Sequence, residues 1–379
     1  MGFSTDAIHF GQEHDPATGA VIVPIHFSSI FAQKELGEGQ PYQYSRTGNP
    51  TRAALEKCLA QLEAGRHGFA FASGVAAIHA SLTLLKTGDH IVAGDNLYGG
   101  TYRLLEQVMK DWGLEITYAD TTKLDRVEAA FRPSTRMLYI ETPSNPMMEI
   151  TDLSACGELA HRHSALLAVD NTFMTPYLQR PLECGADIVI HSTTKYLNGH
   201  SDGIGGAVIV SDAGLAERVK IIQSSVGAVL SPFDSWLVLR SLKTLPVRMR
   251  QHNQNAAVVA EFLKKRAKVV EVFYPGFPAN PGYELAKKQM SGFGGMVSFE
   301  TGSLENAKKV SGALRLCAFS GSLGGAESIV SHPVTMSHSS LTPAQRERSG
   351  LTEGLLRISV GLEDVEDIIG DLEQALGRI

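Results

Sequence analysis

Short, unbroken apolar runs alternate with helical patterns between residues 52 and 210, and this alternation constrains the fold more than any other feature. Strands that are apolar along their whole length are typical of parallel sheets that helices cover on both faces. We therefore predict an α/β fold with a large, mainly parallel sheet. The apolar runs lie at 68–72, 90–93, 137–140, 166–169, 187–190 and 206–210, and the helical patterns at 52–62, 76–85 and 102–112.

Changes in pattern divide the chain into three predicted parts. Residues 1–50 are rich in glycine, proline and polar residues, and we expect an extended N-terminal arm there. Residues 51–248 would form the large domain. A nearly uninterrupted helical pattern over 231–266 would lead into a smaller C-terminal α/β domain, 249–379, with strands at 295–299 and 356–360 and an amphipathic helix at 364–376.

Composition excludes several classes of function. The net charge is −6 and no run rich in lysine or arginine forms a basic stripe, so we expect no nucleic-acid partner. No apolar run reaches the roughly 18 residues of a membrane-spanning helix, and the first residues lack the pattern of a secretion signal, so we expect no membrane association. The cysteines, Cys58, Cys156, Cys184 and Cys317, are far apart, which indicates reduced thiols in a cytoplasmic protein.

A lysine stands just after one of the apolar runs. The run 187–190 leads through His191, Ser192, Thr193 and Thr194 into Lys195. Ligands of open α/β folds bind at the carboxyl ends of the strands, where an amine can form an imine with an aldehyde cofactor. A lysine that stood alone here would more simply be a solvated loop residue, so this interpretation needs support from other positions.

A carboxylate ends another apolar run on the same predicted sheet edge. Asp170 follows the run 166–169, and an acid in that position needs a cationic partner. The protonated nitrogen of a pyridine ring is such a partner, and the pairing keeps the ring an electron sink. The alternative is that Asp170 is a helix N-cap or a loop carboxylate.

A third segment turns from an apolar strand through Ser73 and Gly74 into an alanine-rich helix. The free N–H groups and the positive dipole end of such a helix suit a phosphate, and the hydroxyls of Ser73, Ser192 and Thr194 are available as further donors. A single Ser-Gly turn is usually only a cap, so this segment is weak evidence by itself.

In combination these segments resemble the transsulfuration family of pyridoxal 5′-phosphate (PLP) enzymes, which contains cystathionine γ-synthase, cystathionine γ- and β-lyase and methionine γ-lyase. The resemblance covers essentially the whole chain and implies the fold-type-I architecture of aspartate aminotransferase. The matching motifs are Tyr44-Ser45-Arg46-x-x-Asn49-Pro50-Thr51, Ser73-Gly74, Asp95-x-x-Tyr98-Gly99-Gly100-Thr101, Glu141-Thr142-Pro143-Ser144-Asn145-Pro146, Asp170-Asn171-Thr172-Phe173, His191-Ser192-x-Thr194-Lys195-Tyr196, Ser322-Leu323-Gly324-Gly325 and Leu356-Arg357-x-Ser359-x-Gly361.

The resemblance implies a role for each candidate site residue. Lys195 would be the Schiff-base lysine and proton shuttle, Asp170 the partner of the pyridine nitrogen, and Tyr98 both the residue stacked on the ring and a proton donor to the leaving thiolate. The phosphate would be held by Ser73, Gly74, Val75, Ser192 and Thr194.

The same resemblance implies a shared active site. Tyr44 and Arg46 would reach the phosphate of a neighbouring subunit's cofactor, so the expected assembly is a homo-oligomer, a homotetramer built from dimers. Arg357 would bind the substrate α-carboxylate, and Asn145 and Ser322 would help to position that end of the substrate.

Three positions bear on the substrate. Gly321 and Gln43 stand where enzymes resembling cystathionine γ-synthase and γ-lyase often carry acids, which weakens recognition of the distal ammonium of cystathionine. Gly100 stands where methionine γ-lyases usually carry a cysteine, while the segment 226–236 resembles the cystathionine branch. We predict a carbon–sulfur lyase that acts on cystathionine, methionine or homocysteine by β- or γ-elimination. The alternative is γ-replacement by a cystathionine γ-synthase or O-acylhomoserine sulfhydrylase.

Two other classes of function are weaker. A metal hydrolase could use His161, His163, His191 and His200, or His332 and His338, but the first two would point to different faces of a helix and no carboxylate has ligand spacing. We therefore predict no metal site. A non-catalytic protein with this fold is disfavoured because Lys195, Asp170, Tyr98 and Arg357 occur together.

Overall fold

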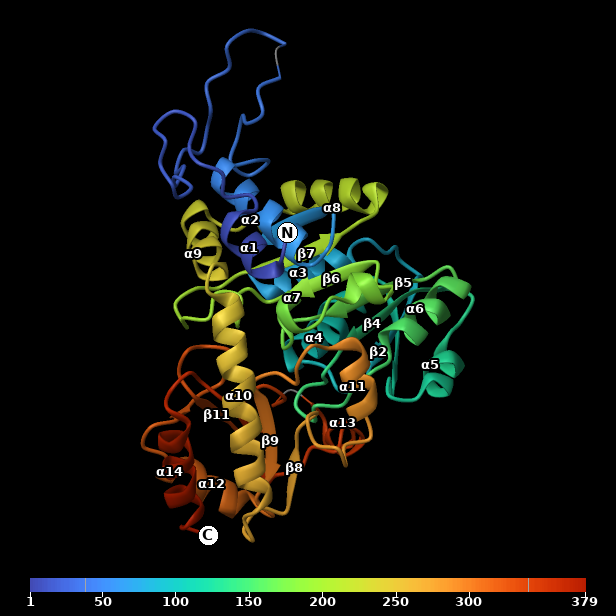
Figure 1. Ribbon diagram of the computed structural model, residues 1–379. Coiled ribbons are helices and arrows are strands. Elements are labelled where there is room, and N and C mark those ends of the chain that lie inside the picture. The colour runs from blue at the N-terminus through green and yellow to red at the C-terminus, as the bar shows by residue number, and fades with distance from the viewer. Residues whose placement is uncertain (38, 340) are drawn as a thin grey trace.

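Two β-sheets joined by one long helix organise this computed structural model, which describes residues 1–37, 39–339 and 341–379 (Figure 1). The seven-stranded sheet has the order β1-β7-β6-β5-β4-β2-β3, and the five-stranded sheet the order β10-β11-β12-β9-β8. Strands of the first sheet are β1 (His67–Phe71), β2 (His90–Gly94), β3 (Glu115–Ala119), β4 (Thr135–Glu141), β5 (Leu166–Asp170), β6 (Ile188–His191) and β7 (Gly206–Val210). Those of the second are β8 (Glu271–Phe273), β9 (Met296–Glu300), β10 (Ala318–Phe319), β11 (Ile329–Ser331) and β12 (Leu355–Ser359).

The large sheet is mainly parallel, as predicted. Strands β2 to β6 pair in parallel, and β7 runs antiparallel to both β1 and β6. Side chains of a strand alternate between faces, and here both faces are buried: Tyr139 packs on one side of β4 and Leu138 on the other. Burial on both faces explains why these strands are apolar without alternation.

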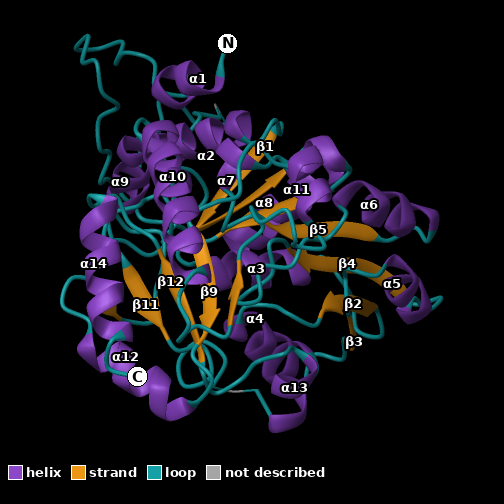
Figure 2. Ribbon diagram, turned by 60° about the horizontal axis from the view of Figure 1, so that its bottom comes forward, coloured by secondary structure: helices purple, strands orange, loops and turns teal. Residues whose placement is uncertain are grey.

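Helices cover both faces of this sheet and the outer face of the smaller one (Figure 2). Those of the N-terminal half are α1 (Phe3–His9), α2 (Pro50–Leu62), α3 (Gly74–Leu82), α4 (Gly99–Leu104), α5 (Leu124–Ala130), α6 (Leu153–Arg162), α7 (Thr175–Leu178) and α8 (Ala213–Val226), with the short η1 (Leu105–Met109) and η2 (Pro181–Cys184). The others are α9 (Pro232–Leu242), α10 (Leu245–Lys264), α11 (Tyr283–Gln289), α12 (Leu304–Ala313), α13 (Pro343–Arg348) and α14 (Val365–Leu376).

The predicted long helix over 231–266 is interrupted. It consists of α9 and α10, which are separated at Lys243 and Thr244, with Pro246 in the first turn of α10. Proline has no N–H and disfavours a helical conformation in the residue before it, so a helix starts well at this point but does not run through it. Helix α10 spans 20 residues and runs from the large sheet to the small one, as Figure 1 shows in yellow.

The predicted extended arm is wrong for its first residues. Residues 3–9 form α1, which packs on α2: Ala7 is fully buried and Gln61 Nε2 donates to Asp6 Oδ2 at 3.0 Å. The burial of one apolar face against α2 stabilises a helix this short, and sequence periodicity is weak over two turns. The rest of the arm projects as the long blue loop in Figure 1.

Within the described ranges, no helix is both long and apolar enough to cross a membrane. The predicted boundary at residue 248 falls inside α10, and the division into domains stays a prediction.

Candidate active site

A cavity of about 230 Å³ lies at the carboxyl ends of the large sheet's strands, where the small-sheet half of the chain closes over them. A larger hollow of about 780 Å³ lies elsewhere, around β8. The smaller cavity is the candidate active site because it collects a lysine, two buried carboxyl groups and a buried arginine. Its lining includes Ser73, Gly74, Val75, Tyr98, Glu141, Asn145, Asp170, Phe173, Ser192, Thr194, Lys195, Leu323 and Arg357.

Lys195 enters this cavity from the turn that follows β6. Its Nζ lies 2.8 Å from Oγ of Ser322, which belongs to the C-terminal half of the chain. Burial, with a smaller effect of the Arg357 charge, lowers the pKa of the amine to about 8. A lysine with such a pKa is in part neutral near pH 7 and can act as nucleophile or base.

Asp170 ends β5 and stands beside Glu141, its partner in the parallel register with β4. Its Oδ1 accepts hydrogen bonds from the N–H of Thr172 at 3.0 Å and from the hydroxyl of the same residue at 2.5 Å. Burial raises the pKa of both carboxyl groups, and the proximity of Asp170 raises that of Glu141 further. A cation placed against this pair would be strongly favoured.

The N-terminus of α3 forms a cradle next to Lys195. Ser73 caps the helix, its Oγ accepting the N–H of Ala76 at 3.1 Å, so the first N–H groups, of Gly74 and Val75, are directed beyond the helix end. A Cβ on Gly74 would lie 2.8 Å from Cβ of Ser192, so only glycine permits this approach. The hydroxyls of Ser192 and Thr194 line the same wall.

Arg357 lies on β12 and is almost fully buried. Its Nη1 donates to Oδ1 of Asn145 at 2.7 Å, and its guanidinium carbon lies 6.0 Å from the ring centroid of Phe173. Burial lowers the pKa of the guanidinium to about 10, so the group is charged at neutral pH. Among the described residues none accepts a hydrogen bond from its Nε, which leaves a donor for a carboxylate.

Tyr98 borders the cavity from the turn before α4. The residue is 37% exposed, and its backbone N–H donates to Oε2 of Glu141 at 2.8 Å. The buried carboxyl group of Glu141 therefore holds the turn from which the Tyr98 side chain reaches the cavity.

The structure brings together all but two of the predicted site residues. Tyr44 and Arg46 are not among the residues described as lining the cavity. The Arg46 guanidinium lies 5.2 Å from the Tyr44 ring centroid and donates to the backbone oxygen of Ser224, and Tyr44 as a whole is 44% exposed.

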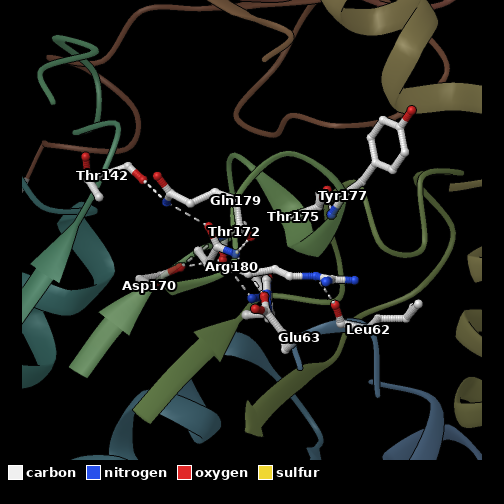
Figure 3. A network of polar contacts seen from close by, with 12 residues as sticks. Leu62, Glu63, Thr142, Asp170, Thr172, Thr175, Tyr177, Gln179 and Arg180 are labelled. Carbon is white, nitrogen blue, oxygen red and sulfur yellow. Dashed lines mark hydrogen bonds and ion pairs between the residues drawn. The ribbon is translucent and has the colours of Figure 1, made fainter. Parts of the chain in front are cut away.

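Two features of the site escaped sequence reasoning. The first is Glu141, which follows the apolar run 137–140 just as Asp170 follows the run 166–169, but for which the sequence predicted no role. The second is a buried network beneath the sheet edge, in which Glu63 Oε1 lies 2.5 Å from Nε2 of His191 and accepts from Asn171 at 2.8 Å. Figure 3 shows this network, which Gln179 continues to the backbone of Thr142.

The residues of the cavity fit PLP. The paired buried carboxyl groups of Asp170 and Glu141 suit a protonated pyridine nitrogen, the free N–H groups at the start of α3 suit a phosphate, and the Lys195 amine suits an aldehyde. No group of three or more histidine, cysteine or acidic side chains is placed to bind a metal ion within the described parts of the chain.

Comparisons with known proteins agree with this geometry. The chain is 50% identical over 375 residues to a cystathionine β-lyase of Coxiella burnetii, covering 98% of this chain and 97% of the relative. It is 48% identical to a cystathionine γ-synthase of Mycobacterium bovis, covering 99% and 97%. The crystal structure of a Lactobacillus plantarum cystathionine γ-lyase complexed with L-serine superposes with a TM-score of 0.97 at 44% identity, covering 100% of this chain and 99% of that one, which confirms the predicted fold. Because a family model described as Cys/Met metabolism PLP-dependent enzyme matches residues 4–377, the chain belongs to that family and is a PLP-dependent enzyme.

Proposed function

We propose that this enzyme is a carbon–sulfur lyase that cleaves cystathionine or a related sulfur amino acid, such as methionine or homocysteine, by β- or γ-elimination. The products would be a thiol, ammonia and a 2-oxo acid. The observation that carries the proposal is the placement of the Lys195 amine, the Asp170 carboxyl group and the Arg357 guanidinium around one cavity. Relatives named cystathionine β-lyase and γ-lyase support the same activity.

Lys195 is the proposed proton carrier. PLP, when bound, supplies a ring that withdraws electrons from the substrate Cα once its proton leaves. The Lys195 amine, with a pKa near 8, would accept that proton, and the Tyr98 hydroxyl would donate a proton to the leaving thiolate. The hydrogen bond to Ser322 directs Nζ toward the cavity, where the reacting carbon would lie.

Arg357 and Asn145 would hold the α-carboxylate of the substrate. Nη1 of Arg357 is held by Asn145, whereas Nε has no partner among the described residues and Nη2 has only a long contact of 3.5 Å to the Ser322 carbonyl oxygen, so the Nε–Nη2 edge is available to the ligand. Cofactor contacts would come from Gly74, Val75, Ser73, Ser192 and Thr194 at the phosphate, Asp170 at the ring nitrogen and Tyr98 over the ring face.

The experiment is a panel of L-cystathionine, L-methionine and L-homocysteine incubated separately with the holoenzyme, with products resolved by mass spectrometry. Homocysteine with pyruvate from cystathionine indicates β-elimination, and cysteine with 2-oxobutyrate indicates γ-elimination. Absence of any 2-oxo acid from all three substrates would remove the lyase proposal. Lys195→Ala is the control and should release no product.

The second candidate function is γ-replacement, as in a cystathionine γ-synthase or an O-acylhomoserine sulfhydrylase. The 48% identity to the Mycobacterium bovis γ-synthase favours it specifically. An O-acylhomoserine offered with cysteine or sulfide discriminates the two functions, because a synthase forms cystathionine or homocysteine where a lyase releases 2-oxobutyrate.

We further propose a homo-oligomer, a tetramer built from dimers, in which the N-terminal arm completes a neighbour's site. Its exposed apolar side chains, among them Phe27 and Ile30 at 70% and 69% exposure, support burial against another subunit. Size-exclusion chromatography with light scattering tests the assembly, and a monomeric active enzyme would refute it. A cytoplasmic location is proposed because all four cysteines are free thiols.

A further inference from the structure

His338 joins the two halves of the candidate active site. It lies in the loop between β11 and α13, in the C-terminal half of the chain, and is 1% exposed. Its Nε2 lies 3.0 Å from the carbonyl oxygen of Leu97 and 3.1 Å from that of Asn145, both in the N-terminal half. One imidazole nitrogen therefore contacts two segments of the cavity wall.

The contacts of the ring determine its protonation. Both partners of Nε2 are carbonyl oxygens, so this nitrogen carries a hydrogen and shares it between them. Nδ1 lies 2.8 Å from Oγ of Ser337, whose hydroxyl donates to it. Burial, with the charge of Arg357, lowers the pKa of His338 to about 4, so the neutral Nε2–H form persists at physiological pH.

The first carbonyl belongs to the peptide group that precedes Tyr98. The N–H of the same peptide group donates to Glu141 Oε2 at 2.8 Å. Both polar atoms of one peptide are thus held by buried side chains, Glu141 from β4 and His338 from the C-terminal half. Because the peptide group is planar, its rotation would break both bonds, so the pair determines the direction from which Tyr98 enters the cavity.

The second carbonyl belongs to Asn145, whose side-chain oxygen accepts from Arg357. Asn145 is therefore held at its backbone by His338 and at its side chain by Arg357. The loop of His338 also packs tightly against the Tyr98 turn, since a Cβ on Gly99 would lie 1.8 Å from the carbonyl oxygen of Ser337. Tyr98, Asn145 and His338 thus belong to one closely packed contact region.

We propose that His338 is a positioning residue that places both Tyr98 and the Asn145–Arg357 pair for substrate binding through one shared N–H. The inference rests on the proposed roles of Tyr98 and Arg357. Loss of the N–H frees two buried carbonyl oxygens at once, so cofactor-face and carboxylate contacts should loosen together.

The test compares His338→Gln with His338→Met, two side chains of similar length and volume of which only glutamine can donate a hydrogen bond to the carbonyls. Glycine and methylamine are titrated against each holoenzyme, with binding followed by the change in the cofactor's visible absorbance. Methylamine lacks the carboxylate that Arg357 would bind. We expect H338M to weaken glycine binding by roughly 10- to 100-fold and methylamine binding by clearly less, because methylamine can lose only the contribution of Tyr98, whereas glycine also loses that of Arg357. H338Q should restore most of the glycine affinity. Should H338M not fold, H338N, whose amide is too short to reach both carbonyls, replaces it.

His332 provides the matched control. It lies in the same loop, is 4% exposed, and contacts Thr335 and the carbonyl of Glu353 at 2.9 Å each, both within the C-terminal half. His332→Met should lower the melting temperature but keep the wild-type ratio of glycine to methylamine affinity. The proposal would be overturned if H338M kept the wild-type ratio of glycine to methylamine affinity, or if H338Q and H338M lost the same amount of glycine affinity. It would also be overturned if H332M changed the ratio as much as H338M does. A wild-type enzyme with no preference for glycine would instead refute the carboxylate role of Arg357 itself.

Discussion

Asp170 and Glu141 are partners in the parallel register of two neighbouring strands, so that two buried carboxyl groups stand side by side at the floor of the cavity. Burial raises the pKa of both groups, and repulsion by the Asp170 carboxylate raises the pKa of Glu141 further. The arrangement becomes favourable when one group keeps a proton and the other faces a cation. We assign the proton to Glu141, whose pKa is raised well above its usual value.

This assignment predicts different outcomes for two equivalent amide substitutions. Asp170→Asn removes the charge opposite the ring nitrogen, and kcat should fall roughly 100-fold, the size of a lost preorganised electrostatic contact. Glu141→Gln keeps a neutral group whose oxygen accepts the Tyr98 N–H, so kcat should stay close to wild type. Steady-state kinetics measure both, and Glu141→Ala, which leaves that N–H without its acceptor, is the control. Equal losses in E141Q and D170N would contradict the assignment.

The lowered pKa of Lys195 predicts how the cofactor-free enzyme recovers PLP. Only the neutral amine attacks an aldehyde, so the rate at which visible absorbance returns after PLP addition should rise with pH through a midpoint near 8. The charge of Arg357 contributes to the low pKa, so Arg357→Gln should move the midpoint to higher pH. Stopped-flow absorbance at a series of pH values measures it, and a midpoint near the roughly 10.4 of an ordinary lysine would refute burial as the cause.

The pair of Glu63 and His191 should matter for stability. Both side chains are fully buried, and Glu63→Ala would leave His191 and Asn171 without their shared acceptor. We expect a loss of about 3–5 kcal/mol in the free energy of unfolding, as for other broken buried pairs. Urea unfolding at fixed protein concentration measures the loss. Glu305→Ala, which removes an exposed ion pair with Lys309, should change little by comparison, and similar effects of the two substitutions would count against this prediction.

A shared active site predicts complementation between two inactive variants. Arg46→Ala should weaken cofactor retention and Lys195→Ala should abolish turnover, because each residue would serve a site formed by two subunits. When the variants are unfolded together and refolded, hybrid dimers contain one site with both native residues, so activity should return. Each variant refolded alone is the control. If the mixture stays as inactive as its components, Arg46 does not act across an interface.

Strand ends were the part of the site that could be predicted from sequence. Lys195, Asp170 and Ser73 each follow an apolar run, and the topology of a parallel sheet brings such positions to one edge. Residues that act through backbone atoms leave no comparable signal. Among the described residues, the His338 ring hydrogen-bonds to two carbonyl oxygens and to the hydroxyl of its neighbour, and 241 and 193 positions separate it from Leu97 and Asn145.

Short elements were missed for a related reason. Strands β8 and β10 span three and two residues, too few to show a period, and they exist because β9 and β11 offer them an edge. Pro246 marks the break between α9 and α10 in the sequence. The helical apolar pattern continues on both sides of this proline, and the pattern alone therefore predicts one continuous helix.

The cavity is built across a seam, with the amine and the acids on one side and the guanidinium on the other. An amino acid that reacts at Lys195 while Arg357 binds its carboxylate would contact both halves of the chain and hold them together. Closer packing of the two halves would therefore be inseparable from recognition of the substrate.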